Sequence, residues 1–319
     1  MQQILLITFP FFALVLFGWC VARMRLLPLE AIPGLNAFVL FFALPCMLYR
    51  FAASTPIVSL LDPAVSTVYL LGALLMVALV LVTTRRGAVG WNDASFGALV
   101  ATFPNSGFMG VPLLVALLGQ RAAGPAIVAL AIDMIVTSSL CIALSRLDGA
   151  HAQGVSGTVG NAVKGMLKNP LPWAIGLGCL TTATGLQLWE PVRNTVGMLA
   201  DGASPVALFT IGAVLARPQK AGATRGLGGF GDVPLVVFYK LVIHPALVLG
   251  LGKLAQAIGV PLDGFALTVL VLIAALPSAS TIPMLAERFG ADSGRIARIV
   301  LFATAASFVS FSAAVALLI

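Results

Sequence analysis

Two short proline-containing motifs interrupt long apolar stretches of this sequence, and their residues suit the binding of a small anion. The first reads Phe103-Pro104-Asn105-Ser106-Gly107, and the second reads Leu276-Pro277-Ser278-Ala279-Ser280-Thr281. Proline removes a backbone donor and clashes with the preceding helical turn, so each motif is expected to break a helix. The predicted helix-breaking residues are Pro104, Pro112, Pro277 and Pro283.

A broken helix would present bare N–H groups, together with the positive end of its dipole, to a bound anion. Amide and hydroxyl side chains beside the breaks could donate further hydrogen bonds to a carboxylate. Carbonyl groups freed at the opposing half-helix ends could hold a cation instead. The predicted substrate-binding residues are Asn105, Ser106, Gly107, Ser278, Ser280 and Thr281.

Three ionisable residues, Asp133, Asp201 and Lys240, lie within apolar stretches, where such side chains are costly and commonly functional. They are the predicted candidates for binding a coupling ion or a proton, and the residue types leave H⁺ and Na⁺ as alternatives. Two other interpretations stay open: a hydrogen-bonded packing role for Asp133, and a Lys240 ammonium that reaches the membrane interface. His244, which precedes Pro245, is interpreted as structural.

No metal ion or organic cofactor is expected from the sequence. The four cysteines lie in apolar stretches without a C-x-x-C pair, so they are interpreted as small buried hydrophobic residues. The sequence contains no His-Glu-x-x-His, Walker A or Gly-x-Ser-x-Gly motif. An intramembrane aspartyl enzyme that uses Asp133 and Asp201 is the one enzymatic alternative, and no motif surrounds either residue.

The elements that position these residues are predicted to be membrane-spanning helices. Hydrophobic residues make up 60% of the 319 residues and charged residues 9%, whereas a soluble domain carries about 25% charged residues. The first apolar stretch lacks the features of a signal peptide and is interpreted as a span. A bilayer needs about 20 apolar residues per helix. Ten stretches fit: 3–22, 34–53, 64–84, 95–118, 125–145, 170–188, 196–216, 234–255, 264–287 and 297–318.

The basic residues are distributed unevenly between these stretches. Of the 18 lysines and arginines, 13 follow odd-numbered stretches. The positive-inside rule therefore predicts cytoplasmic odd connections, both termini outside, and a multi-pass protein of the cytoplasmic (inner) membrane. The net charge of +7 comes largely from basic residues in these connections, where they set the membrane orientation, so no nucleic-acid partner is predicted. The connections after even-numbered stretches, with the span ends beside them, hold only Arg50, Arg121, Arg193 and Lys253.

Ten spans divide into a first repeat at 1–148, a cytoplasmic linker at 149–169 and a second repeat at 170–319. The halves would have opposite orientations, and the proline motifs fall in the fourth and ninth spans, which correspond in a five-plus-five arrangement. Freed backbone groups cannot face lipid, so the breaks must be buried or line a polar cavity. Paired interrupted helices indicate a transporter binding site near the bilayer midplane, and packed proline kinks are the alternative.

The stretch from Pro104 to Leu113, read as Pro-Asn-Ser-Gly-Phe-Met-Gly-Val-Pro-Leu, resembles the fourth-span signature of the auxin efflux carrier family. That family includes plant auxin exporters and bacterial malate or malonate permeases. The order and spacing of further motifs extend the resemblance across nearly the whole chain. These motifs lie at residues 35–39, 44–45, 169–170, 204–216, 240–245, 277–279 and 285–292.

The resemblance implies an all-α membrane fold related to the bile acid/sodium symporters. Spans 1, 2, 6 and 7 would form a panel or scaffold domain. Spans 3–5 and 8–10 would form a core or transport domain that contains crossing broken helices 4 and 9 and moves like an elevator. Asn105 matches the family asparagine that contacts the substrate carboxylate. The ninth span departs from members with asparagine near the second break, because it offers Ser278, Ser280 and Thr281, and this leaves the substrate open.

The sequence therefore predicts a secondary active carrier of a small organic anion in the lipid bilayer, a mono- or dicarboxylate such as malonate or malate. A sodium-coupled symporter of a larger, bile acid-like anion is the alternative within transport, and a channel is a third hypothesis. A homodimer is considered beside the monomer.

Overall fold

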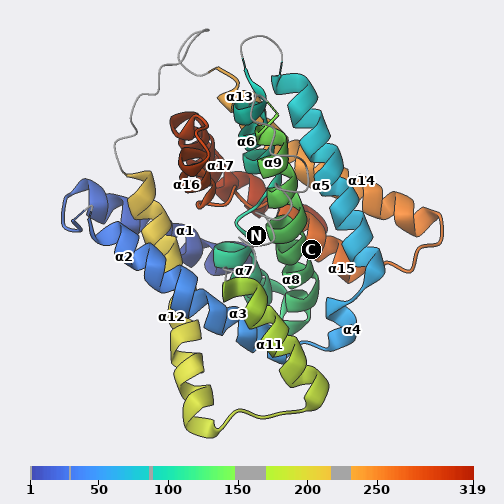
Figure 1. Ribbon diagram of the computed structural model, residues 1–319. Coiled ribbons are helices and arrows are strands. Elements are labelled where there is room, and N and C mark those ends of the chain that lie inside the picture. Colours follow the sequence, from blue (N-terminus) through green and yellow to red (C-terminus); the bar gives the residue numbers. More distant parts are fainter. Residues whose placement is uncertain (1, 29, 86–88, 148–169, 217–230) are drawn as a thin grey trace. The chain divides into compact units, whose positions relative to one another are not determined.

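The computed structural model describes residues 2–28, 30–85, 89–147, 170–216 and 231–319 of the chain (Figure 1). Within these ranges the regular secondary structure is helical and no strand is formed, which confirms the predicted all-α class. The predicted linker at 149–169 lies outside the described residues.

Several helices are long and apolar enough to cross a membrane. In the described part of the chain seven candidates meet this criterion: Leu6–Arg23, Ala31–Ala53, Ile57–Thr84, Gln120–Ser145, Glu190–Leu215, Val233–Ala257 and Ser293–Leu318. Two shorter apolar helices, Ser106–Leu118 and Gly264–Ala274, belong to the stretches with proline motifs. The predicted stretch 170–188 contains the 15-residue helix α11 (Pro170–Thr184). A multi-pass membrane protein follows from these helices, and the count of ten spans stays a prediction.

The chain forms two compact units. Unit 1 comprises the described residues within Met1–Asp62, Gly107–Val128 and Met166–Pro218, and unit 2 comprises those within Pro63–Ser106, Ala129–Gly165 and Gln219–Ile319. The panel and core domains that the resemblance implies stay a prediction.

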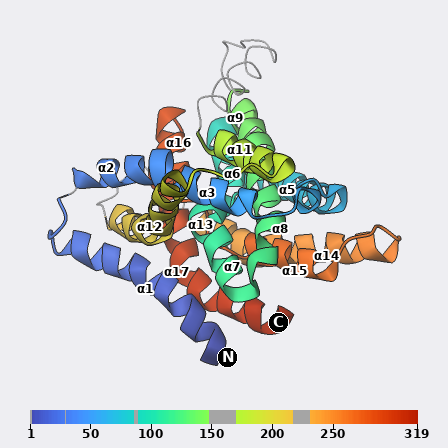
Figure 2. The same ribbon diagram turned by 90° about the horizontal axis from the view of Figure 1, so that it is seen from below.

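Unit 1 is built around long helices that pack closely. Helix α12 (Glu190–Leu215) lies along α1 (Gln2–Arg23) and against α3 (Leu44–Ala53), which also packs on α11 (Figure 2). Glycine permits the α1–α12 contact, because a Cβ at Gly18 would clash with the Phe209 carbonyl and one at Gly212 with the Val15 carbonyl. The remaining helices are α2 (Ala31–Phe38), joined to α3 by a π-helical turn, α4 (Ile57–Leu60) and α7 (Val111–Leu118).

Unit 2 contains the whole second proline motif and the first motif as far as Ser106. Its helix α5 (Pro63–Thr84) packs on α6 (Trp91–Thr102) and α14 (His244–Ala257), and α14 packs on α15 (Gly264–Ala274). Helix α6 also contacts α9 (Ser138–Ser145), while α16 (Ile282–Arg288) and α13 (Val233–Phe238) contact α17 (Ser293–Leu318). Helix α8 (Ala123–Ile132) has residues in both units and leads through a π-helical turn, Asp133–Thr137, into α9.

Arg295 ties three helix ends of unit 2 together. Its guanidinium donates to both carboxylate oxygens of Asp232 at 2.8 and 2.5 Å, and to the Asp93 carbonyl at 2.7 Å. The Asp93 carboxylate accepts the backbone N–H of Asp292 at 2.7 Å. These contacts join the starts of α6, α13 and α17. The sequence predicted Arg295 only as a topology signal, because spacing along the chain does not show a distant partner.

Candidate functional site

Helical order stops at both predicted motifs. Helix α6 ends at Thr102 and a π-helical turn, Ser106–Gly110, begins after residues 103–105, which we call the first interruption. Helix α15 ends at Ala274 and α16 begins at Ile282, so residues 275–281 form the second interruption. Pro104 and Pro277 lie inside the interruptions. Pro112 and Pro283 lie instead in the first turns of α7 and α16, where the missing N–H costs little.

The two interruptions pair with each other through their backbones. Pro104 and Ser278 form an isolated antiparallel bridge. The Asn105 N–H donates to the Pro277 carbonyl at 2.8 Å, and the Ala279 N–H donates to the Phe103 carbonyl at 3.0 Å. These bonds satisfy groups that would be costly to leave bare in a membrane.

The polar side chains at the interruptions divide into two classes. The Ser278 hydroxyl donates to the Val100 carbonyl near the end of α6 at 2.6 Å. The Ser106 hydroxyl donates to the Pro104 carbonyl at 3.2 Å. Both donors are therefore occupied by the fold, whereas the groups in the other class are free to bind a ligand.

The second class consists of Asn105, Ser280 and Thr281. Asn105 is 5% exposed, and its side-chain amide has no hydrogen-bond partner among the described residues. Ser280 and Thr281 are half-buried, and their hydroxyls likewise form no hydrogen bond within the described ranges. The structure thus leaves an amide and two hydroxyls available beside the paired interruptions, and Gly107 is buried in the adjacent turn.

Asp133 is fully buried in unit 2 and is satisfied by hydroxyl donors. The Tyr69 hydroxyl donates to one carboxylate oxygen at 2.7 Å, and the Thr137 hydroxyl donates to the other at 3.2 Å. Sequence reasoning missed Tyr69, although a tyrosine inside an apolar helix usually needs a partner for its hydroxyl.

Lys240 is also fully buried, so its ammonium does not reach the membrane interface. It donates to the Ala274 carbonyl at 3.0 Å, and its nitrogen lies 3.2 Å from His244 Nδ1. The Lys240 amine therefore lies at the C-terminal end of α15, directly before the second interruption, where the helix dipole would favour a positive charge. The Tyr69 and His244 rings lie 6.3 Å apart. We call Tyr69, Asp133, Lys240 and His244 the polar cluster.

Asp201 lies in a different environment from Asp133. It belongs to α12 in unit 1, its side chain is 72% exposed, and its carboxylate accepts from Arg50 at 2.6 Å. The two aspartates share no partner among the described residues. Asp201 is therefore one side of a surface ion pair, whereas Asp133 is part of the polar cluster.

Comparison with known proteins adds independent evidence. Residues 4–315 match the sequence model of the family described as "Membrane transport protein". A protein of Rhizobium meliloti (strain 1021) named "Putative malonate transporter" is 26% identical over 311 residues, covering 95% of this chain and 92% of that protein. Auxin efflux carrier component 8 of Arabidopsis thaliana is 23% identical over 322 residues, covering 85% of each chain.

A further relative is the uncharacterized transporter YfdV of Escherichia coli (strain K12). It is 26% identical over 201 residues, which cover 62% of this chain and 59% of that protein. Because the family model spans nearly the whole chain, the match does not rest on a single motif. The chain therefore belongs to the membrane transport protein family, as its resemblance to the auxin efflux carriers predicted, and it is a membrane transporter and not an enzyme.

Proposed function

We propose that this transporter is a secondary active carrier of a small organic anion, a mono- or dicarboxylate such as malonate or malate. The observation that carries the proposal is the pairing of the two interruptions beside Asn105, a buried amide without a hydrogen-bond partner in the described part of the chain. The name of the Rhizobium meliloti relative supports malonate as the first substrate to test.

The free polar groups at the interruptions favour a carboxylate. The carbonyls of Phe103 and Pro277 already accept hydrogen bonds, so the groups left over are mainly donors. Asn105, Ser280 and Thr281 would donate from their side chains, and the 13-residue apolar helix Ser106–Leu118 would direct its N-terminal dipole at the ligand. Gly107 would contribute through its backbone N–H. Ser106, whose N–H and hydroxyl both donate to the Pro104 carbonyl, and Ser278 would hold the two interruptions in place.

We place these residues in a ten-span, five-plus-five inverted repeat with an elevator-like mechanism. One feature supports the repeat: each proline motif is followed by a helix that ends near a glycine with positive φ, Gly119 at 82° and Gly290 at 72°. The two compact units support a division into a panel and a core. The charge bias supports an inner-membrane protein with both termini outside.

The polar cluster is the proposed coupling site. It contains a buried acid, a buried amine and a buried imidazole within one unit. The Lys240 side chain already donates to the Ala274 carbonyl, so fewer carbonyl oxygens remain at the end of α15 to bind a sodium ion. We therefore propose protons as the coupling ion. Uptake that stops when choline replaces sodium would instead favour the sodium-coupled symporter.

The first test replaces Asn105 with alanine and measures uptake of radiolabelled malonate into proteoliposomes. A hydrogen bond to a charged group contributes about 1.5–3 kcal/mol, so we expect the apparent affinity to fall about tenfold or more. Asn194→Ala is the matched control, because Asn194 is exposed on α12. Unchanged affinity and rate in Asn105→Ala would remove Asn105 from the site.

A further inference from the structure

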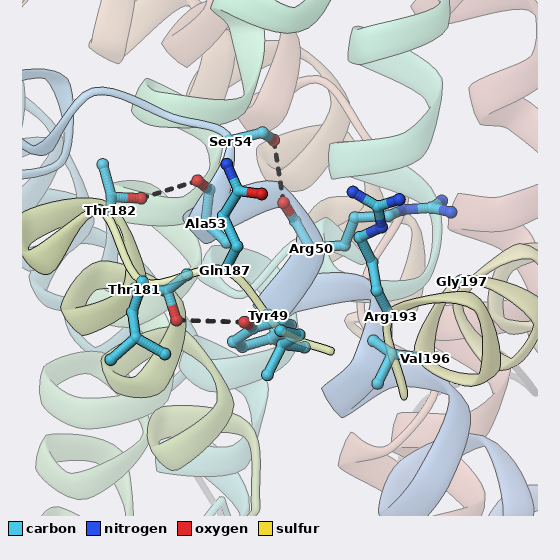
Figure 3. A pocket seen from close by; sticks show the side chains of 13 residues that line it. Tyr49, Arg50, Ala53, Ser54, Thr181, Thr182, Gln187, Arg193, Val196 and Gly197 are labelled. Carbon is cyan, nitrogen blue, oxygen red and sulfur yellow. Dashed lines mark hydrogen bonds between the residues drawn. The ribbon is translucent and has the colours of Figure 1, made fainter. Parts of the chain in front are cut away.

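Unit 1 contains a cavity of about 410 Å³ that no step of the proposed mechanism uses (Figure 3). It lies between α3, α11 and the start of α12, and its lining residues all belong to unit 1. Sites for small ligands commonly have volumes of about 300–1,000 Å³. The cavity is therefore large enough for a small organic molecule or a phospholipid headgroup.

Two arginines make this cavity positively charged. Arg50 and Arg193 both line it, and Figure 3 draws their side chains on the same side of the pocket. Asp201 pairs with Arg50, but the Arg193 guanidinium has neither an acidic partner nor a hydrogen bond among the described residues. Two guanidinium groups with one carboxylate leave a net positive charge, which a bound anion would balance. We call this space the arginine cavity.

Membrane topology does not explain these arginines. Arg50 lies near the end of the second apolar stretch and Arg193 follows the sixth, and at both places the charge bias predicts few basic residues. Arginine presents several donors in a planar fork that matches a carboxylate or a phosphate. A binding role accounts for two arginines in one cavity better than a role in orientation does.

The wall of the arginine cavity is fixed by contacts between α3 and α11. The Tyr49 and Thr181 hydroxyls lie 3.1 Å apart in a hydrogen bond, and the Thr182 hydroxyl donates to the Ala53 carbonyl at 2.8 Å. A Cβ on Gly178 would lie 2.6 Å from the Ala52 Cβ, so only glycine allows this approach of the two helices. A wall held in this way loses little entropy when a ligand binds.

We propose that the arginine cavity is a second anion site that binds the carboxylate or phosphate group of a small oxyacid. Arg193 would hold the anionic group through two parallel N–H donors, with Arg50 beside it. The exposed Gln187 amide would donate a further hydrogen bond, and the Tyr49 ring would contact the carbon skeleton. The same chemistry suits a soluble dicarboxylate and the phosphate of an anionic lipid.

The test uses a local chemical reporter. Val196 lines the cavity one turn after Arg193, so Val196→Cys is introduced after Cys20, Cys46, Cys141 and Cys179 are replaced by alanine. The protein is placed in nanodiscs of phosphatidylcholine, and the labelling rate with an uncharged maleimide is measured. We expect malonate to slow labelling several-fold and the uncharged malonamide to leave it unchanged. Equal rates with malonate and malonamide would exclude a soluble dicarboxylate as the ligand, and a lack of protection by phosphatidylglycerol as well would overturn the proposal.

Arginine variants then identify the group that binds. With Arg193→Gln, half-protection should need at least about tenfold more malonate, since a charge-assisted pair is lost. Arg23→Gln is the matched control, because Arg23 is exposed at the end of α1. Full protection in Arg193→Gln would overturn the assignment.

Two further experiments distinguish a lipid headgroup from a soluble anion, and the arginine cavity from the site at the interruptions. Protection by phosphatidylglycerol in the nanodisc, but not by malonate, would support the cavity as a headgroup site; protection by neither would overturn it. Asn105→Ala should keep the protection at residue 196 while it lowers uptake. Loss of protection in Asn105→Ala would contradict a second site, whatever its effect on transport.

Discussion

The polar cluster of unit 2 and the arginine cavity of unit 1 hold their charges in opposite ways. Asp133 and Lys240 are fully buried, and their partners are hydroxyls, a carbonyl and an imidazole. The Arg50 and Asp201 side chains are 41% and 72% exposed and pair directly. Removing a partner from a buried charge is expensive, whereas an exposed ion pair contributes little. The same residue type, aspartate, therefore has different consequences in the two units.

The largest expected effect comes from Lys240→Met. The substitution removes the donor to the Ala274 carbonyl and the amine beside His244 Nδ1, in a fully buried environment. A buried polar group left without its partner costs about 1–3 kcal/mol, so the loss of two such contacts should lower the free energy of unfolding in detergent by about 3 kcal/mol. Lys253→Met on the exposed side of α14 is the control. Denaturant titrations that give equal losses for both variants would contradict the difference between buried and exposed charges.

Tyr69→Phe should have the next largest effect. It removes a hydroxyl donor from the buried Asp133 carboxylate, and a hydrogen bond to a charged group contributes about 2 kcal/mol. Tyr239→Phe provides a control, because Tyr239 is half-buried and its hydroxyl forms no hydrogen bond within the described ranges. The same titrations measure both variants. Equal stability of Tyr69→Phe and the wild type would show that the hydroxyl does not support Asp133.

Ser278→Ala and Ser280→Ala test whether the two serines at the second interruption have different roles, one in stability and one in binding. The Ser278 hydroxyl bonds the Val100 carbonyl, so its loss should cost about 1 kcal/mol of stability. Ser280→Ala should keep the stability and weaken malonate binding, because its hydroxyl is free in the described structure. Thermal unfolding and radiolabelled binding measure the two effects. The reverse pattern would exchange the roles of the two residues.

The smallest effect on stability is expected for Asp201→Asn. The Arg50–Asp201 pair is exposed, so its loss should cost less than about 1 kcal/mol, and added salt should reduce even that difference. The freed Arg50 should lower the malonate concentration that protects Val196→Cys in the arginine cavity. A stability loss as large as that of Lys240→Met would show that the two units do not differ as described.

Local chemistry explains which features the sequence predicts. Prolines act on their own helical turn, and two prolines in one stretch with Gly or Ser between them predict the interruptions at Pro104 and Pro277. A single proline does not suffice, because Pro10 and Pro205 lie inside the continuous helices α1 and α12. Pro112 has the same residue type but lies at a helix start, which depends on where the preceding turn resumes. The fold class follows from the length of the apolar stretches, because about 20 consecutive apolar residues span a bilayer as a helix.

Tertiary contacts explain what the sequence does not predict. Asp133 and Asp201 both lie in apolar stretches, and only packing distinguishes the buried carboxylate from the exposed one. The partners of Ser278 and Arg295 lie far away in the sequence, and no spacing rule connects them. The arginine cavity combines residues from three helices, so its charge is visible only once those helices have packed.

The hydrogen bond from the backbone N–H of Asn105 to the Pro277 carbonyl has a consequence for biosynthesis. Residue 105 emerges from the ribosome well before residue 277, by roughly 10 to 30 seconds at about 5–20 residues per second. Throughout that interval the Asn105 N–H and the Phe103 carbonyl lack their hydrogen-bond partners, and lipid cannot replace them. The insertion machinery or ordered water must satisfy these two backbone groups until the later segment is synthesised. The pairing of the two interruptions is therefore a late event in the assembly of the protein.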